Sequence, residues 1–520
     1  MLDFLYVQLV TCIRGGSMEY KVMLEKLKRL QEKVNYYKSL NMNFMWDQWS
    51  SLPSQGNIYR QKMQQYFGGL QLDLIQTDEV KTIFDFFNSY DLSVVDSDIE
   101  KALIIQFLLI FKNQINIPKE LSIELMRITQ ESQSAWMKAR QENNYEIFKP
   151  HLKALIDIKK EIAIQIDSTK LPFQVIVEST DQGIELQEID RVFDELKTFI
   201  TGTMLKIKKS SVIVEDDFLL NSKFDENILF ETLKDILYTS GLDRTRSTCG
   251  KAVHPFTTII GPKDSRITLN CSTFSLGVFG GLHEMGHAMY GYSGSEEVNE
   301  MGIFGGIQGG FHEGIARFYE NIIGKSHSFW KLNYFKIQQN FPEMKDISFE
   351  QYYRAINKVK ENTNRIVADE VSYSLHPIIR YELERELFSG ILTVDELPNA
   401  WNLKYKSYLG IEPKSDLEGV LQDIHWSVGM FGYFQSYTLG NIFGGQILNQ
   451  LKNDIPDVFS EIENGNFDNM NKWLVNNVFK FSTTYSSVEL IKMISGSKLD
   501  TKFYTDYLKD KYYKIYNIVE

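Results

Sequence analysis

Apolar residues recur every three or four positions along most of this sequence, and this pattern constrains the fold more than any other feature. The spacing matches the turn of an α-helix, so each such segment is predicted to bury one side of a helix. Only 11 of the 520 residues are proline, so few positions interrupt a helix. The predicted helices cover residues 21–37, 98–115, 118–143, 147–166, 186–201, 349–358, 371–388 and 488–494. The chain is therefore predicted to be mainly α.

One region departs from the helical pattern. Residues 256–260 and 265–270 are rich in β-branched side chains, and a Gly-Pro-Lys-Asp turn at 261–264 separates them. They predict a small β-sheet directly before the histidine-rich segment 283–287. A strand at the cleft could pair with an extended peptide through main-chain hydrogen bonds. A purely structural hairpin fits the same pattern equally well.

The chemistry is concentrated in His283-Glu284-Met285-Gly286-His287. Residues four apart lie on the same face of a helix, so the two imidazoles can converge on one metal ion. Glu284 lies about 100° further round the helix from His283, where it can act as general base on a water that the metal activates. Glu313, 26 positions after His287, can complete a set of three ligands that leaves one coordination position open, as in catalytic zinc sites.

A surface helix with inactive histidines is the alternative to this mononuclear metal site. Glycine, leucine, alanine and tyrosine flank the motif, which predicts a buried helix. Histidines buried there need partners, because an unpaired buried polar group costs roughly 2–7 kcal/mol. Seven of the eight histidines lie between His254 and His425, and this clustering favours an active site.

The bulk properties exclude several classes of function. A net charge of −12 without a basic patch argues against a nucleic-acid partner. The longest apolar run, residues 102–111, is too short for the ~20 residues of a membrane span. Three cysteines are too few for a disulfide framework and indicate a cytoplasmic location. Cys271 could line the site, but a buried, inert thiol is the favoured interpretation.

No repeat, low-complexity tract or long linker divides the chain. The candidate residues extend from His254 to Tyr437, so a division near the middle of the chain would split the site. We therefore expect residues 18–520 to form a single large domain, with helical lobes flanking a deep central groove. Residues 1–17 precede a strong helix pattern and lack a basic leader and a cleavage site, so they are predicted to be a dispensable extension.

Further motifs accompany the metal site in a fixed order. They are His254-Pro255-Phe256, Asp264-Ser265-Arg266-Ile267-Thr268, His283 to His287, His312-Glu313, Arg365-Ile366-Val367-Ala368-Asp369 and Gly419-Val420-Leu421-Gln422-Asp423-Ile424-His425-Trp426. Together they resemble the carboxypeptidase Taq family, metal-dependent enzymes that remove residues one at a time from peptide C-termini. The chain differs from the family pattern at Gly314, Asn364, Gln435 and in residues 178–183. None of these differences removes a ligand or the base.

The resemblance implies roles for residues outside the metal motif. His425 and Tyr437 are candidates to donate hydrogen bonds to the oxyanion of the tetrahedral intermediate, with Tyr433 in reserve. Core packing is the alternative for both tyrosines. Arg365 is expected to bind the substrate's C-terminal carboxylate, and a structural salt bridge with Asp369 is the alternative.

Further residues are expected to support the site. Arg266 and His254 match family motifs, and we expect them to support the substrate-binding cleft rather than to contact the peptide directly. Asp369 and Asp423 are expected to orient the metal ligands as outer carboxylates.

The resulting prediction is a metallocarboxypeptidase that binds one Zn²⁺ per chain, although Co²⁺ or Mn²⁺ suits the same ligands. Peptides are the expected partners, nucleic acid and membrane are not, and a homodimer is implied only by the resemblance. Two rival functions share the motif. One is an endo-acting metallo-oligopeptidase, and the other is a degenerate peptide-binding module with a structural metal.

Overall fold

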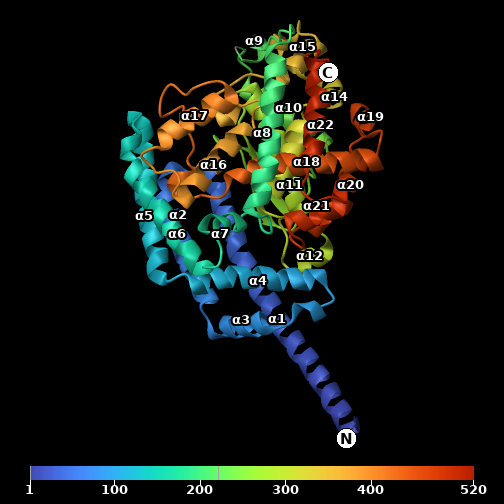
Figure 1. The fold of residues 1–520 in the computed structure, drawn as a ribbon. Helices are drawn as coiled ribbons and strands as arrows, with labels where there is room; N and C mark the ends of the chain where they lie inside the picture. Colours follow the sequence, from blue (N-terminus) through green and yellow to red (C-terminus); the bar gives the residue numbers. More distant parts are fainter. Residues whose placement is uncertain (1, 221, 520) are drawn as a thin grey trace.

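Helices make up most of the computed structural model, which describes residues 2–220 and 222–519 (Figure 1). The first half of the chain contains α1 (Leu2–Ser50), α2 (Asn57–Ile75), α3 (Asp78–Ser89), α4 (Asp98–Asn116), α5 (Lys119–Glu142), α6 (Lys149–Ile166), α7 (Pro172–Glu178), α8 (Leu186–Lys208), α9 (Asp217–Leu220) and α10 (Glu226–Thr239). The strands β1 (Ser247–Lys251), β2 (Phe256–Gly261) and β3 (Asp264–Leu269) follow. The second half contains α11 (Phe274–Tyr292), α12 (Glu296–Glu300), α13 (Gly310–Arg317), α14 (His327–Asn340), α15 (Phe349–Ile356), α16 (Leu375–Ser389), α17 (Leu397–Leu409), α18 (Phe434–Asp454), α19 (Val458–Glu463), α20 (Asp468–Asn477), α21 (Ser487–Ser495) and α22 (Lys502–Ile515).

The mainly α prediction is confirmed, and the protein is a single helical domain with one small sheet. Every helix predicted from periodicity is present, with differences at the ends. The largest differences are in α1, which extends from Leu2 to Ser50 rather than over residues 21–37, and in α8, which continues to Lys208 rather than ending at residue 201. α16 begins late, at Leu375 rather than at residue 371. The reason is Asp369, whose carboxylate accepts the backbone N–H groups of Val371 and Ser372 and so holds this segment in turns.

The sheet has three strands in the order β1-β3-β2. The predicted β2–β3 hairpin is confirmed as an antiparallel pair, and β1 adds to β3 in parallel. β1 was not predicted, because its sequence Ser-Thr-Cys-Gly-Lys lacks alternating apolar residues. Because β2 is at the edge of the sheet, one side of its backbone is free of strand partners.

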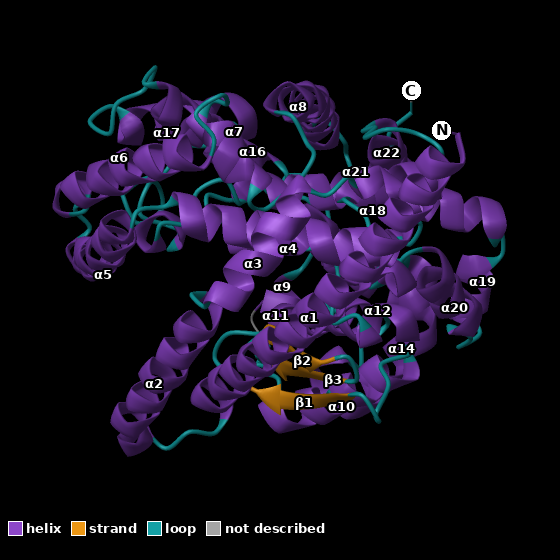
Figure 2. Ribbon diagram, turned by 90° about the horizontal axis from the view of Figure 1, so that it is seen from below, coloured by secondary structure: helices purple, strands orange, loops and turns teal. Residues whose placement is uncertain are grey.

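The sheet packs between two long helices, α1 and α11 (Figure 2). On the α1 side, the ring of Trp46 meets that of Phe256 at 5.8 Å between centroids. On the other side, Ile267 and Leu269 are fully or almost fully buried against the core that contains α11. This sandwich places the edge strand β2 directly beside the helix that carries the histidine motif.

Two hydrophobic cores correspond to two parts of the domain. The larger core extends from α5 to α22. The smaller core joins α1, α3 and α4 through residues such as Leu27, Ile83 and Leu103, and it includes Val298 and Ile303 from the segment after α11. Residues 1–17 have no described side chains, so their predicted dispensability stays a prediction.

Glycine allows α11, α13 and α18 to pack with their backbones almost in contact. A Cβ atom on Gly286 would lie 2.7 Å from the Cα atom of Ala316, and one on Gly314 would lie 2.8 Å from the carbonyl oxygen of Gly440. Both contacts are with backbone atoms, which cannot rotate away. The three helices that carry the candidate site are therefore held at fixed, short separations.

Candidate metal centre and active site

Three side chains from two helices converge on one point. α11 supplies His283 and His287, and α13 supplies Glu313. The two imidazole Nε2 atoms are 3.1 Å apart, and they lie 3.8 and 3.9 Å from one carboxylate oxygen of Glu313. The three ligands predicted from the sequence are therefore brought together.

Hydrogen bonds fix the orientation of the His287 ring. His312 Nε2 lies 3.0 Å from the carbonyl oxygen of Gly305, to which it must donate. Burial lowers the pKa of His312 to about 4, so its other nitrogen carries no proton. His287 Nδ1 lies 2.6 Å from that nitrogen and donates to it, which leaves the Nε2 lone pair directed at the metal point.

Glu320 holds the second histidine in the same way. Its carboxylate lies 2.9 Å from His283 Nδ1, in the π-helical segment Phe318–Ile323 that directly follows α13. Burial would raise the pKa of Glu320, but Arg317 and His283 outweigh it and lower the pKa to about 2. The ionised carboxylate accepts the Nδ1 proton, so His283 also presents Nε2 to the metal point.

The prediction that Asp369 and Asp423 orient the ligands is therefore wrong. Asp369 accepts hydrogen bonds from the turns before α16, and Asp423 binds two arginines. Glu320 and His312 occupy the outer positions instead.

The donor set fits a divalent metal ion. All three ligand atoms lie within 4.8 Å of one another. Ligands of a tetrahedral zinc ion, at about 2.0–2.1 Å from the metal, stand about 3.3 Å apart, which is close to the observed separations. Two nitrogens and one carboxylate also leave a coordination position for a water molecule or substrate. The spacing, and the tautomers inferred from the hydrogen bonds, are what such an ion requires.

Glu284 is buried beside this centre without belonging to the ligand set. Thr257 Oγ1 on β2 donates to its carboxylate at 2.6 Å. Burial raises the pKa of Glu284 above the usual carboxyl range. The base predicted from the motif is thus held in one orientation by the edge strand.

A cavity of about 310 Å³ opens beside the metal point. Its lining includes His287 and Glu313, Tyr433 from the segment before α18, Thr257 from β2, and Lys38 from α1. A larger cavity, of about 620 Å³, lies between α18 and α22, and its lining includes none of the three metal ligands. The smaller cavity is therefore the one that can hold the reacting part of a substrate.

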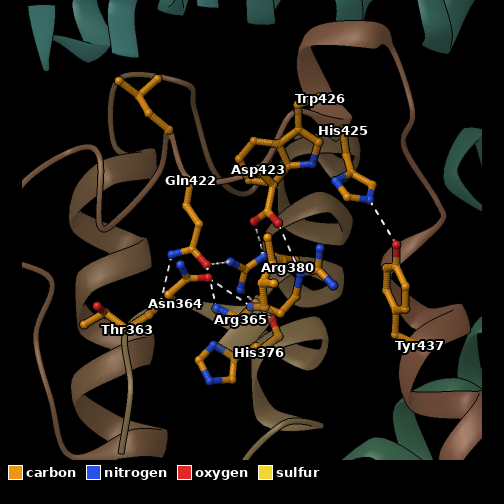
Figure 3. Close-up of polar contacts among 12 residues, drawn as sticks. Thr363, Asn364, Arg365, His376, Arg380, Gln422, Asp423, His425, Trp426 and Tyr437 are labelled. Atoms are coloured by element: carbon orange, nitrogen blue, oxygen red, sulfur yellow. Dashed lines mark hydrogen bonds and ion pairs between the residues drawn. The ribbon is translucent and has the colours of Figure 1, made fainter. Parts of the chain in front are cut away.

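Arg365 and Arg380 form a buried pair around Asp423 (Figure 3). Arg365 Nε donates to one oxygen of Asp423 at 3.1 Å, and Arg380 Nε donates to the other at 2.6 Å. The expected alternative partner, Asp369, is not the residue that pairs with Arg365. Since two guanidinium groups share one carboxylate, the cluster keeps an excess positive charge. Tyr437 lies beside it, with its ring centroid 4.7 Å from the Arg365 guanidinium.

The predicted oxyanion donors form a pair. His425 Nε2 and the Tyr437 hydroxyl are 3.2 Å apart. Figure 3 marks this contact with a dashed line. Burial lowers the pKa of His425 to about 4, so the ring is neutral, and its Nδ1 atom has no hydrogen-bond partner among the described residues. Burial raises the pKa of both Tyr437 and Tyr433, so both hydroxyls keep their protons and can donate.

Arg266 and His254 lie on the supporting sheet. Arg266, on the central strand β3, forms an ion pair with Asp264 at 2.9 Å. His254 is exposed in the loop before β2, and its carbonyl oxygen accepts a hydrogen bond from Thr268. Neither residue lines the cavity beside the metal point. These positions agree with a supporting role.

Asp181 links the two helices on either side of the cavity. Its buried carboxylate accepts the N–H of Gly310 at 2.7 Å, at the start of α13, and the hydroxyl of Ser436 at 2.6 Å, at the start of α18. Gln435, one of the positions that differ from the family pattern, donates to it as well. Gly309 must be glycine, because it has φ +66° and a Cβ there would lie 2.7 Å from the same carboxylate.

Several residues of the site were missed from the sequence. Glu320 lies seven residues after Glu313, a spacing of two helical turns that could have indicated a shared face. Arg380, Thr257 and Lys38 carry no comparable signal, because the contacts that place them are between segments far apart in the chain.

The thiol of Cys271 is buried, as predicted. The residue is 6% exposed, and burial raises its pKa to about 11, as an inert structural cysteine requires.

Comparison with known proteins places this geometry in a family. Residues 26–512 match the family model for carboxypeptidase Taq (M32) metallopeptidases. Carboxypeptidase 1 of Bacillus subtilis is 31% identical over 494 residues, which cover 94% of this chain and 97% of that protein. Thermostable carboxypeptidase 1 of Thermus thermophilus is 28% identical over 506 residues, or 95% of this chain and 98% of that protein.

A solved structure shows the same similarity in three dimensions. The crystal structure of the M32 carboxypeptidase from Deinococcus radiodurans R1 superposes with a TM-score of 0.91 at 27% identity, covering 96% of this chain and all of that one. The matches extend over both helical parts and the sheet between them. The chain belongs to the carboxypeptidase Taq (M32) metallopeptidase family and is a metal-dependent carboxypeptidase.

Proposed function

We propose that His283, His287 and Glu313 hold one Zn²⁺ ion per chain, in an enzyme that releases C-terminal residues from peptides. Co²⁺ and Mn²⁺ suit the same ligands. The convergence of these side chains, with a hydrogen-bond partner at the Nδ1 atom of each imidazole, is the observation that carries the proposal. When bound, the ion supplies Lewis acidity to the scissile carbonyl and acidifies the water that attacks it.

Glu284 moves the protons of the reaction. Its carboxylate takes a proton from the attacking water and delivers it to the leaving amine. Thr257 restricts the side chain to one position through its 2.6 Å hydrogen bond. Such a general base contributes about 10²–10⁴-fold in rate.

Arg365 binds the terminal carboxylate of the substrate. A guanidinium group suits a planar carboxylate, and the shared Asp423 neutralises only one of the two positive charges in the cluster. Arg365 Nε and Nη1 contact Asp423 and Tyr373, which orients the remaining edge of the group. Binding a chain end in this way favours an exopeptidase over the endo-acting alternative.

His425 and Tyr437 stabilise the oxyanion. Whichever of the two groups donates the hydrogen bond between them, one proton is left for the oxyanion. When the imidazole Nε2–H donates to the tyrosine oxygen, that proton is the one on the tyrosine hydroxyl. Loss of one such donor costs about 10²–10³-fold in turnover. Tyr433, which lines the cavity, is the reserve candidate.

Two further expectations concern the whole protein. None of the described helices combines the length and apolar character of a membrane span. The two described cysteines, Cys249 and Cys271, are unpaired, which supports a cytoplasmic location. A homodimer is proposed from the family resemblance, and light scattering of the purified protein tests it.

Product analysis tests the proposed activity. The zinc-loaded enzyme is incubated with a blocked pentapeptide bearing a free C-terminus and with its C-terminally amidated form, and products are identified by mass spectrometry. We expect stepwise loss of C-terminal residues from the free acid and no cleavage of the amide. Internal cuts in the amidated peptide would show an endopeptidase instead.

Glu284→Gln should lower kcat by about 10²–10⁴-fold while zinc remains bound. Parent-level turnover by this variant would remove Glu284 from its role.

A further inference from the structure

Lys38 contributes a positive charge to the active-site cavity, and the reaction proposed above gives this residue no role. It comes from α1, in the N-terminal part of the domain, and lines the cavity together with His287, His312 and Glu313. Among the described residues, no side chain forms a hydrogen bond or an ion pair with its ammonium group. Its side chain keeps access to solvent, although the surrounding protein lowers its pKa.

Contacts of neighbouring residues fix the part of α1 that carries Lys38. Next to it, the Ser39 hydroxyl donates to the carbonyl oxygen of Ile260 at the end of β2. One turn earlier, Asn35 Nδ2 donates to the carbonyl oxygen of Gly302 at 2.8 Å. α1 is thus attached to the edge strand and to the segment before α13, the two sides of the cavity. The exposed side chain of Lys38 extends from this anchored part of α1, lines the cavity and is available to a ligand.

The charges around Lys38 indicate what that ligand carries. Glu313 belongs to the metal centre, and the Glu284 carboxylate accepts a hydrogen bond from Thr257. Glu320 is paired with His283 and Arg317. No acidic side chain of the described chain therefore neutralises Lys38. In a partly enclosed cavity a charge-assisted hydrogen bond is about twice as strong as a neutral one. An anionic group on the substrate is the natural partner.

The two cationic sites are separate. Arg365 does not line the cavity that contains Lys38, whereas Tyr433 does. Tyr433 also lies close enough to Arg365 for the guanidinium charge to act on the pKa of its hydroxyl. If Arg365 binds the terminal carboxylate, the released residue lies on the Arg365 side of the metal point. The remainder of the peptide then lies in the cavity, beside β2 and α1.

We propose that Lys38 selects peptides with an acidic side chain among the three residues that precede the cleaved bond. This inference rests on the proposed carboxypeptidase reaction and on Arg365 as its anchor. It makes α1 a specificity element as well as a structural one. Substrates would be acidic peptides, cleaved one residue at a time until the acidic side chain has passed the site.

Matched peptides test the proposal. Blocked pentapeptides ending in phenylalanine carry one Glu or one Gln at the first, second or third residue before the cleaved bond, and kcat/KM is measured from phenylalanine release. For the parent, we expect Glu to exceed Gln on the order of tenfold at one or more positions, mainly through KM. Lys38→Met should bring that ratio to about one, and Lys38→Glu should invert it and favour a Lys-containing peptide. Lys33→Met, which removes an exposed lysine of the same helix outside the cavity, should keep the parent's ratio.

Each other outcome overturns the proposal. A Glu-to-Gln ratio near one in the parent, or a ratio that Lys38→Met leaves unchanged, removes Lys38 from substrate selection. If Lys38→Met lowers kcat/KM equally on the Glu and Gln peptides, then Lys38 contacts the peptide main chain or stabilises the fold and does not select acidic side chains. Failure of the carboxypeptidase reaction is separately visible, because the parent would then release phenylalanine from none of the peptides.

Discussion

At the scale of single residues, the site depends on side chains that never touch the metal. His312 and Glu320 each accept an Nδ1 proton, and in doing so they fix both imidazoles in the tautomer that presents Nε2. Their removal leaves the ligands present but free to rotate or to change tautomer. Outer contacts of this kind are usually worth 10–100-fold in metal affinity.

Glu320→Gln tests this contribution. Gln keeps the size of the side chain but removes the negative charge beside His283 and Arg317. We expect zinc affinity to fall by about 10–100-fold, measured by competition with a chromophoric chelator. Glu343→Gln, at an exposed glutamate, is the matched control and should bind zinc as the parent does. Equal affinity in both variants would contradict the role of Glu320.

A second residue-scale prediction concerns Glu384, which is fully buried and accepts N–H groups of Trp426 and Gly432. Burial raises its pKa from about 4.5 to about 8. Between these values the folded protein binds a proton that the unfolded chain has released. The stability contributed by this group is therefore complete below about pH 4.5 and is lost as the pH rises towards 8.

Glu384→Gln removes that titration. We expect the melting temperature of the variant to gain on that of the parent as the pH rises from 5 to 8, with a constant offset for the lost acceptor. Each unit of difference in pKa is worth about 1.4 kcal/mol. A melting-temperature difference that stays the same across this pH range would show that Glu384 does not titrate there.

At the scale of elements, the metal centre depends on the close approach of α11 and α13. Gly286→Ala would place a methyl group 2.7 Å from the Cα atom of Ala316 and so push the two ligand-bearing helices apart. We expect a loss of about 1–3 kcal/mol in stability, together with weaker zinc binding. Chemical unfolding and zinc titration measure both effects.

The control for this prediction lies on the same helix. Gly280 has room for a methyl group, because an added Cβ would make an ordinary van der Waals contact with Pro255 Cγ at 3.7 Å. Gly280→Ala should be neutral or stabilise the protein by up to about 1 kcal/mol through helix propensity. Equal destabilisation by both substitutions would show that the α11–α13 contact is not the cause.

The elements also show where prediction from the sequence succeeds and fails. Helical periodicity, runs of β-branched residues and the i, i+4 motif are local signals, so they predicted the helices, the β2–β3 hairpin and the two histidine ligands. β1 was missed because its partner, β3, supplies the pairing that its own sequence does not suggest. The start of α16 was misplaced because the Asp369 carboxylate competes for backbone N–H groups, an interaction that apolar spacing does not register.

At the scale of the whole molecule, the site is assembled from parts that are far apart in sequence. Asp181 joins the starts of α13 and α18, Asp423 joins Arg365 to Arg380, and α1 contacts the sheet and the segment before α13. No spacing rule connects these residues, so the arginine cluster and the cationic side of the cavity could not be predicted from the sequence. The family motifs named Arg365 and His425, but only the structure provides their partners.

The central claim is that His283, His287 and Glu313 together hold one divalent ion. Metal content after chelation, reloading with zinc and gel filtration tests it most directly, with the parent and Glu313→Gln compared. We predict one zinc ion per parent chain, less than one in the variant, and a zinc-dependent rise in melting temperature for the parent only. One tightly bound zinc ion per chain in Glu313→Gln, with the same rise in melting temperature, would contradict the account.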